Sequence, residues 1–137
     1  MPTTRPIVLV GYDGSEPAQR ALEHAAELVG RRGSVSVINV VKAQSVSSRW
    51  VTLTDKERAA QDRLLRESER VLARLGVDAN IIAAAGDPAT EILAASESIG
   101  AGVIVIGRRK RSIPRLVRTP LSNTLVRRAG IDVLVVH

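Results

Sequence analysis

The chain has 137 residues, which suits one domain and gives enough volume for a hydrophobic core. It has 20 basic and 14 acidic side chains, hence a net charge of +6, and it contains no cysteine, so disulfides and thiolate metal sites are excluded. With one tyrosine, one tryptophan and no phenylalanine, it lacks the aromatic platforms on which single-stranded nucleic acids stack.

No apolar run approaches the ~20 residues that a membrane-spanning helix needs. No small-residue cleavage pattern follows the short apolar run near the N-terminus, so we predict no signal peptide. These features predict a cytoplasmic protein without a membrane partner, with residues 1–137 forming one domain.

The first predicted strand is the apolar run PIVLVGY at residues 6–12. The turn GYDGS follows, and Ser15 is placed to cap a helix that begins at about Glu16. Two interpretations fit Asp13 in this turn. Its carboxylate can bind nearby backbone N–H groups, or it can accept a hydrogen bond from a ligand.

Two further strands are predicted at residues 34–41 (SVSVINVV) and 77–85 (VDANIIAAA). Between them Thr54 and Glu57 form a capping-box signature, which predicts a helix from there to about Leu75. We expect the buried face of this helix to comprise the apolar residues that recur at helical spacing, namely Ala60, Leu64, Val71 and Leu75.

The next helix is predicted to begin with Asp87 as its N-cap and to end at Gly100. A last helix is predicted at residues 120–129, with Thr119 as its N-cap and Pro120 in its first position. The chain then ends in a strand at residues 132–136.

The most distinctive stretch runs from residue 102 to residue 122. It opens with the strand VIVIG at residues 103–107, whose continuous apolar character is typical of a strand buried on both faces of a parallel sheet. A run of basic residues without an acidic one follows: Arg108, Arg109, Lys110, Arg111, Arg115 and Arg118. This run is either a solvated loop or an anion site beside a helix N-terminus, and we favour the anion site because crowded like charges repel each other.

Alternating strands and helices predict an α/β fold of three layers, in which a five-stranded parallel sheet lies between helices. If the strand order is 3-2-1-4-5, the winding reverses between the first and fourth strands, and ligands bind where it reverses. Asp13 and the basic run after Gly107 would then face each other across one crevice.

Several chemistries are excluded by the motifs that the chain lacks. Neither the dinucleotide fingerprint nor the P-loop is present, and the strand at residues 77–85 ends in alanines where a phosphoacceptor would need aspartate. His24 and His137 are predicted to lie on the surface, and no covalent nucleophile is evident. We therefore expect no metal site and no catalytic residues, with slow ATP hydrolysis assisted by Asp13 as an alternative.

Five segments in order resemble the universal stress protein family over essentially the whole chain: IVLVGYDGSEPAQRALEHA, SVSVINVV, GDPATEIL, VIVIG and LSNTLVRRAGIDVLVVH. The resemblance implies a Rossmann-like sheet of order 3-2-1-4-5 and a non-enzymatic role in stress response. It also implies a homodimer formed by antiparallel pairing of the last strands, and an exposed apolar edge strand favours the same arrangement. The interface would comprise Val133, Leu134, Val135 and Val136.

Many members of that family bind ATP through the pattern G-x2-G-x9-G-[S/T]. Gly107 matches its first glycine, but Lys110 or Arg109 stands at the second, and Thr119 and Pro120 stand at the final glycine and serine. Side chains in place of glycines, and a proline without an N–H group, argue against the usual ATP pose. Arginines bind phosphate well, however, and could replace some of the lost backbone donors.

The predicted ligand is an adenine nucleotide or another phosphate-bearing small molecule, and the replaced glycines disfavour ATP itself. The resemblance places Asp13 on the ribose side and Val40 on the base side. The full set of predicted nucleotide contacts is Gly11, Tyr12, Asp13, Val40, Ile106, Gly107, Arg109, Lys110, Thr119, Pro120, Leu121 and Ser122. The predicted anion contacts are Arg108, Arg111, Arg115 and Arg118. In an alternative function, the basic run docks an acidic protein or nucleic acid, with an affinity that falls steeply with salt.

Overall fold

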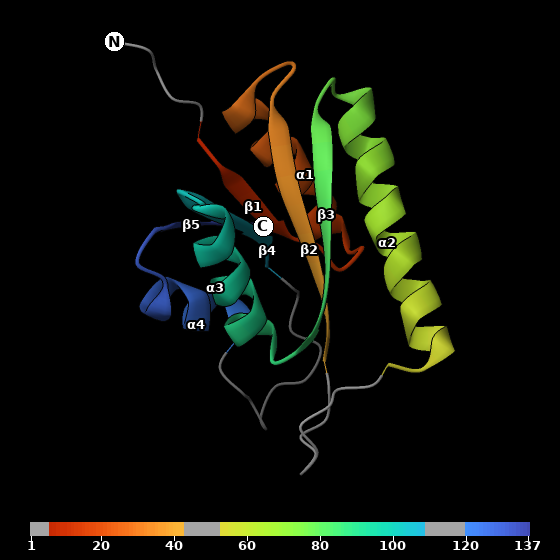
Figure 1. Cartoon of the computed structure of the whole chain (residues 1–137). Helices are drawn as coiled ribbons and strands as arrows, with labels where there is room; N and C mark the ends of the chain where they lie inside the picture. Colours follow the sequence, from red (N-terminus) through yellow and green to blue (C-terminus); the bar gives the residue numbers. More distant parts are fainter. Residues whose placement is uncertain (1–5, 43–52, 109–119) are drawn as a thin grey trace.

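The computed structural model describes residues 6–42, 53–108 and 120–137 (Figure 1). Helices and strands alternate along these ranges as predicted, and the strand at the N-terminus is shorter than expected. The elements are β1 (Val8–Gly11), α1 (Glu16–Val29), β2 (Ser34–Lys42), α2 (Asp55–Arg74), β3 (Asp78–Gly86), α3 (Pro88–Ile99), β4 (Val103–Gly107), α4 (Leu121–Arg128) and β5 (Asp132–Val136).

The five strands form one parallel sheet in the order β3-β2-β1-β4-β5, which confirms the predicted fold and strand order. β1 lies at the centre, and Gly11 at its end is paired with Ile38 of β2 on one side and Ile106 of β4 on the other. The winding of the chain therefore reverses between β1 and β4, as predicted.

Helices cover both faces of the sheet (Figure 1). α1 and α2 pack on one face, over a core that includes Val10 and Val105, whereas α3 and α4 pack on the other, over Leu9 and Ile104. All four of these strand side chains are completely buried. Burial on both faces explains why the central strands are apolar throughout instead of alternating with polar residues.

Local hydrogen bonds begin three of the helices where the sequence predicts. Ser15 Oγ accepts from the N–H of Ala18 at 3.3 Å, and Asp87 Oδ2 accepts from the N–H of Thr90 at 3.0 Å. The capping box before α2 is complete, because the Thr54 hydroxyl and the Glu57 carboxylate each accept from the other's backbone N–H. Each cap satisfies N–H groups that a helix terminus leaves unpaired.

The predicted buried face of α2 was wrong. Ala60 is exposed and Leu75 is 41% exposed, while Leu64 and Val71 lie at the margin of the core. The buried face of the helix is shifted by one residue toward the C-terminus. The Gln61 amide donates to carbonyls of β2 and β3, and this holds that face against the sheet. That face comprises Gln61, Leu65, Ser68 and Leu72.

The predicted first position of α4 was also wrong. Pro120 occupies the N-cap position in an extended conformation, with φ −53° and ψ 144°, and α4 begins at Leu121. Pro120 thus lies one position before the predicted one, and Thr119 lies outside the described residues. Within the described ranges, no helix combines the length and the apolar character that a bilayer crossing demands.

Candidate functional site

The predicted site lies where β1, β2 and β4 end, and we call this region the carboxyl edge. It comprises residues 12–15, Lys42, Arg108 and the first turn of α4. Because β1 and β4 are paired as far as Gly11 and Ile106, the segments that follow them leave the sheet side by side. The N–H of Arg108 donates to the carbonyl of Val136 at 2.7 Å, which ties the end of β4 to β5.

Asp13 is exposed at this edge and accepts two hydrogen bonds through Oδ1. The donors are the backbone N–H of Ser15 at 3.0 Å and its hydroxyl at 2.6 Å. The interpretation of Asp13 as a turn residue that binds nearby backbone is therefore confirmed. Because Ser15 in turn caps α1, these bonds link the turn directly to the start of that helix.

The side chain of Tyr12 faces α2 and not the carboxyl edge. It is 2% exposed, packs in the core beneath α1 and α2, and donates its hydroxyl proton to Glu67 Oε1 at 2.6 Å. Its main-chain groups are also bonded, since its N–H donates to Ile38 and its carbonyl accepts from the Asn39 amide at 2.8 Å. The predicted nucleotide contact through Tyr12 thus finds no support from the side chain.

Burial, together with the Glu67 carboxylate, raises the pKa of the Tyr12 phenol well above its ordinary value of about 10. Tyr12 is the sole tyrosine, so tyrosinate absorbance reports on it alone. We expect no tyrosinate in the folded protein at pH 10. A transition near pH 10 in the folded state would contradict the buried hydrogen bond.

The same shift predicts a change in stability. Since the folded pKa is raised, the contribution of Tyr12 to the free energy of unfolding is complete below about pH 10 and declines as the pH rises toward the folded pKa. The Tyr12→Phe variant should be less stable at neutral pH, by about 1–2 kcal/mol for the lost hydrogen bond. The difference between the two proteins in urea denaturation should shrink above pH 10.

Other predicted contacts lie on the opposite face of the sheet. Ile106, 3% exposed, and Val40 both belong to the core beneath α3 and α4, and Leu121 of α4 packs against the same core. The structure thus brings Val40, Ile106 and Leu121 to one face and sends Tyr12 to the other. The sequence analysis had predicted that all four contact the same nucleotide.

Gly107 has a packing reason to be glycine. A Cβ at this position would lie 2.3 Å from the carbonyl carbon of Pro17 and 2.5 Å from the backbone nitrogen of Ala18, in the first turn of α1. Such distances do not occur between real atoms, so β4 can end against α1 only through a glycine. The match of Gly107 to the nucleotide-binding pattern is therefore explained without a ligand.

The N-terminus of α4 has the features of an anion site. No side chain of the described residues caps it, and its first turn contains no acidic residue. Its first helical bond runs from the N–H of Thr124 to the carbonyl of Pro120 at 3.2 Å. Because α4 returns the chain to the start of the parallel strand β5, this end of the helix lies toward the carboxyl edge. The hydroxyl-bearing Ser122 is buried in this turn.

Within the basic run, Arg108 is described and is exposed. The remaining members lie outside the described residues, so their predicted roles as nucleotide or anion contacts stay predictions. They are Arg109, Lys110, Arg111, Arg115 and Arg118, together with Thr119.

Two buried amides near the carboxyl edge were missed by sequence reasoning. Asn39 is 8% exposed and Gln61 is 5% exposed. The Gln61 amide donates to the Asn39 carbonyl at 2.9 Å and to the Ala84 carbonyl at 2.8 Å, and so joins α2 to β2 and β3. A signal was present, since Asn39 interrupts an apolar strand and Gln61 shares a helical spacing with Leu65 and Leu72.

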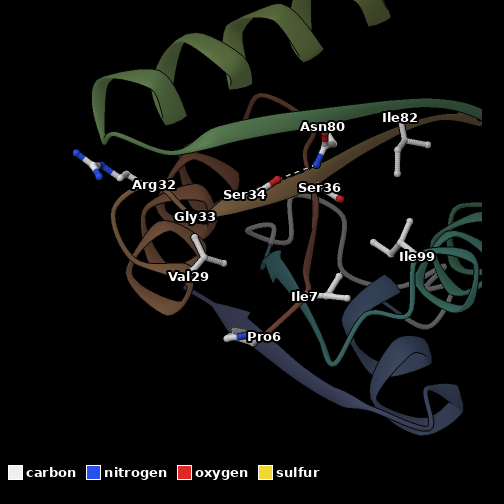
Figure 2. A pocket seen from close by; sticks show the side chains of 10 residues that line it. All are labelled: Pro6, Ile7, Val29, Arg32, Gly33, Ser34, Ser36, Asn80, Ile82 and Ile99. Carbon is white, nitrogen blue, oxygen red and sulfur yellow. Dashed lines mark hydrogen bonds between the residues drawn. The ribbon is translucent and has the colours of Figure 1, made fainter. Parts of the chain in front are cut away.

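A cavity of about 580 Å³ lies at the opposite, amino end of the strands (Figure 2). Its lining includes Ile82 and Ile99, and also Ser34 and Asn80, whose side chains bond to each other at 2.7 Å. Among the residues that the structure describes, no predicted site residue lines it. This cavity is therefore distinct from the predicted site.

The fold and the carboxyl edge together define a doubly wound parallel α/β domain with a candidate ligand site at its switch point. The family model described as "Universal stress protein family" matches residues 4–137. The chain belongs to this family, as the resemblance implied. No curated protein matches the chain.

Solved structures support the same fold. A universal stress protein family member from Burkholderia pseudomallei is 26% identical, with a TM-score of 0.73, over 99% of this chain and 98% of that one. A universal stress protein in complex with cAMP is 24% identical, with a TM-score of 0.73, over 98% and 99%. The protein from Archaeoglobus fulgidus in complex with dAMP is 19% identical, with a TM-score of 0.71, over 96% and 98%.

Proposed function

We propose that this protein is a non-enzymatic universal stress protein that binds an adenine nucleotide at the carboxyl edge, and that it binds a nucleoside monophosphate better than ATP. The observation that carries the proposal is the pairing of β1 with β4 up to Gly11 and Ile106. This pairing brings the Asp13 turn and Arg108 to one place, where doubly wound sheets bind ligands.

The described residues supply a chemically suitable environment for each part of such a ligand. The exposed Asp13 carboxylate can accept from ribose hydroxyls, and the apolar face at Val40 suits the base. The uncapped N-terminus of α4 offers N–H groups and a partial positive charge to phosphate, and Arg108 adds a full charge. Two relatives of the same fold, in complex with cAMP and dAMP, point to the same class of ligand.

A preference for monophosphates follows from the residues that replace the family's glycines. A triphosphate needs close approach to several backbone N–H groups, which Cβ atoms hinder and a proline at position 120 cannot offer. One phosphate at the N-terminus of α4 needs fewer of these groups. No side chain in the described site is placed as a base beside a γ-phosphate, so we expect no turnover.

Isothermal titration with AMP, cAMP and ATP–Mg²⁺ tests the proposal. We expect AMP or cAMP to saturate the protein and ATP to bind more weakly. Asp13→Asn should weaken AMP binding about tenfold, since a charged acceptor of ribose hydroxyls is lost. Asp62→Asn is the matched control, because Asp62 is an exposed aspartate on α2 that pairs with Arg66.

Three outcomes would contradict the proposal. Tight saturation by ATP–Mg²⁺ would show that the missing glycines do not matter. Steady phosphate release from ATP that Asp13→Asn abolishes would make the protein a hydrolase. A titration without heat for any of the three nucleotides would exclude the nucleotide site altogether.

We also propose that two copies form a homodimer by antiparallel pairing of β5. This strand is one edge of the described sheet, so the backbone groups on its outer side have no neighbouring strand within this chain. Leu134 in its middle is 37% exposed. An apolar edge strand of this kind tends to pair with another chain. Antiparallel pairing with its own copy gives the free backbone groups of both strands hydrogen-bond partners.

A further inference from the structure

A chain of buried hydrogen bonds connects α2 to the turn that holds Asp13. Gln61 Nε2 donates to Asn39 Oδ1 at 3.2 Å as well as to the Asn39 carbonyl at 2.9 Å. Asn39 Nδ2 then donates to the carbonyl of Tyr12 at 2.8 Å. Asp13 is the next residue along the chain, so the network ends directly beside the proposed ribose acceptor.

Gln61 and the Tyr12 carbonyl together favour one orientation of the Asn39 side chain. An asparagine amide has its acceptor oxygen on one side and its donor nitrogen on the other. Since the Gln61 donor faces Oδ1, the nitrogen of Asn39 is directed at Tyr12. Without Gln61, Asn39 would keep a buried oxygen with one donor fewer, and only its bond to the Tyr12 carbonyl would still favour the present orientation.

α2 also holds Tyr12 at a second point. The Tyr12 hydroxyl donates to Glu67, which lies further along α2 than Gln61. The main chain of Tyr12 is thus held through Asn39 and its ring is held through Glu67. On its other side the turn is bonded to α1, because Ser15 donates to Asp13 and caps that helix. The turn is therefore fixed between two helices.

We propose that Gln61 is a positioning residue for the nucleotide site: through Asn39 it fixes the main chain that presents Asp13, so that ligand binding at the carboxyl edge is coupled to α2. This inference rests on the proposed function. It assigns a role to a helix that packs behind the Asp13 turn, and the coupling must act in both directions, since binding free energies are linked.

Titration of AMP into the Gln61→Leu variant tests the inference. Leucine keeps the apolar volume of the side chain but removes the donor, and we expect the AMP Kd to rise about tenfold. Ser68→Ala is the matched control. Ser68 lies completely buried on the same face of α2, but its hydroxyl bonds to the Leu65 carbonyl within the helix, at 2.6 Å. This control should lower the melting temperature and leave the Kd unchanged.

Hydrogen exchange on the unaltered protein gives a second readout that needs no variant. We expect AMP to slow amide exchange in residues 58–68 of α2, although none of them contacts the ligand. An unchanged AMP Kd in Gln61→Leu overturns the inference and leaves the nucleotide site intact. The absence of any AMP effect on α2 overturns it as well, even where Gln61→Leu fails to fold. A protein that binds none of AMP, cAMP and ATP overturns the proposed function and this inference together.

Discussion

Gly107→Ala is expected to lower the free energy of unfolding by about 2–3 kcal/mol, a large loss for a single methyl group. The new Cβ would meet the backbone of Pro17 and Ala18 at 2.3–2.6 Å. Backbone atoms in the first turn of a helix cannot move aside as a flexible side chain can. β4 and α1 must therefore separate, and the completely buried core between them, which includes Val105 and Leu22, loses contacts.

Urea denaturation followed by circular dichroism measures this loss. Gly102→Ala is the matched control at the other end of the same strand. A Cβ there meets no atom within 4 Å, so stability should stay within about 0.5 kcal/mol of the unaltered protein. Equal midpoints for the two variants would mean that the end of β4 does not pack against α1 as described. The result also bears on function, since a large loss would mean that glycine is needed at this position even without a nucleotide.

Leu134→Glu is expected to convert the proposed homodimer to a monomer, weakening self-association by at least about tenfold. Leu134 is the central residue of the five-residue strand β5. In an antiparallel pair whose two-fold axis passes through the middle of the strand, which is the register we propose, the central residue faces its own copy. Each dimer would lose two apolar side chains from the interface and would gain two carboxylates opposite each other.

Sedimentation equilibrium measures the assembly directly, because the chain has a mass of 14.7 kDa and the dimer twice that value. Val126→Glu provides the control. Val126 is 56% exposed on α4, outside β5, and the same substitution there should leave the dimer intact. A monomer in the unaltered protein would exclude the interface, and so would a dimer that survives Leu134→Glu.

The predicted fold was confirmed because the signals that specify it are local. Each cap is a hydrogen bond between residues three positions apart, as at Ser15, Thr54 and Asp87. Apolar runs of strand length and glycines at helix ends are likewise recognised from a few consecutive residues. Alternation of strands and helices then leaves few topologies, and the family resemblance selected among them the order that the structure shows.

The meeting of the segments that follow β1 and β4 was predicted, whereas the directions of the side chains there were not. That the Asp13 turn and the end of β4 would meet followed from the strand order. The direction of the Tyr12 side chain did not, because its partner Glu67 lies 55 residues away along the chain. The helical pattern of α2 likewise predicted that apolar residues form its buried face. Gln61 is buried instead, because carbonyls of β2 and β3 accept hydrogen bonds from its amide.

The sequence by itself therefore determined the order of the elements, the starts of α1, α2 and α3, and the edge of the sheet at which a ligand is expected. All of these depend on interactions within a few residues or on the family pattern. Only the tertiary structure decided which face of α2 is buried, where Tyr12 points and why position 107 must be glycine. Those outcomes depend on atoms that are distant in the chain and that meet only when the helices pack on the sheet.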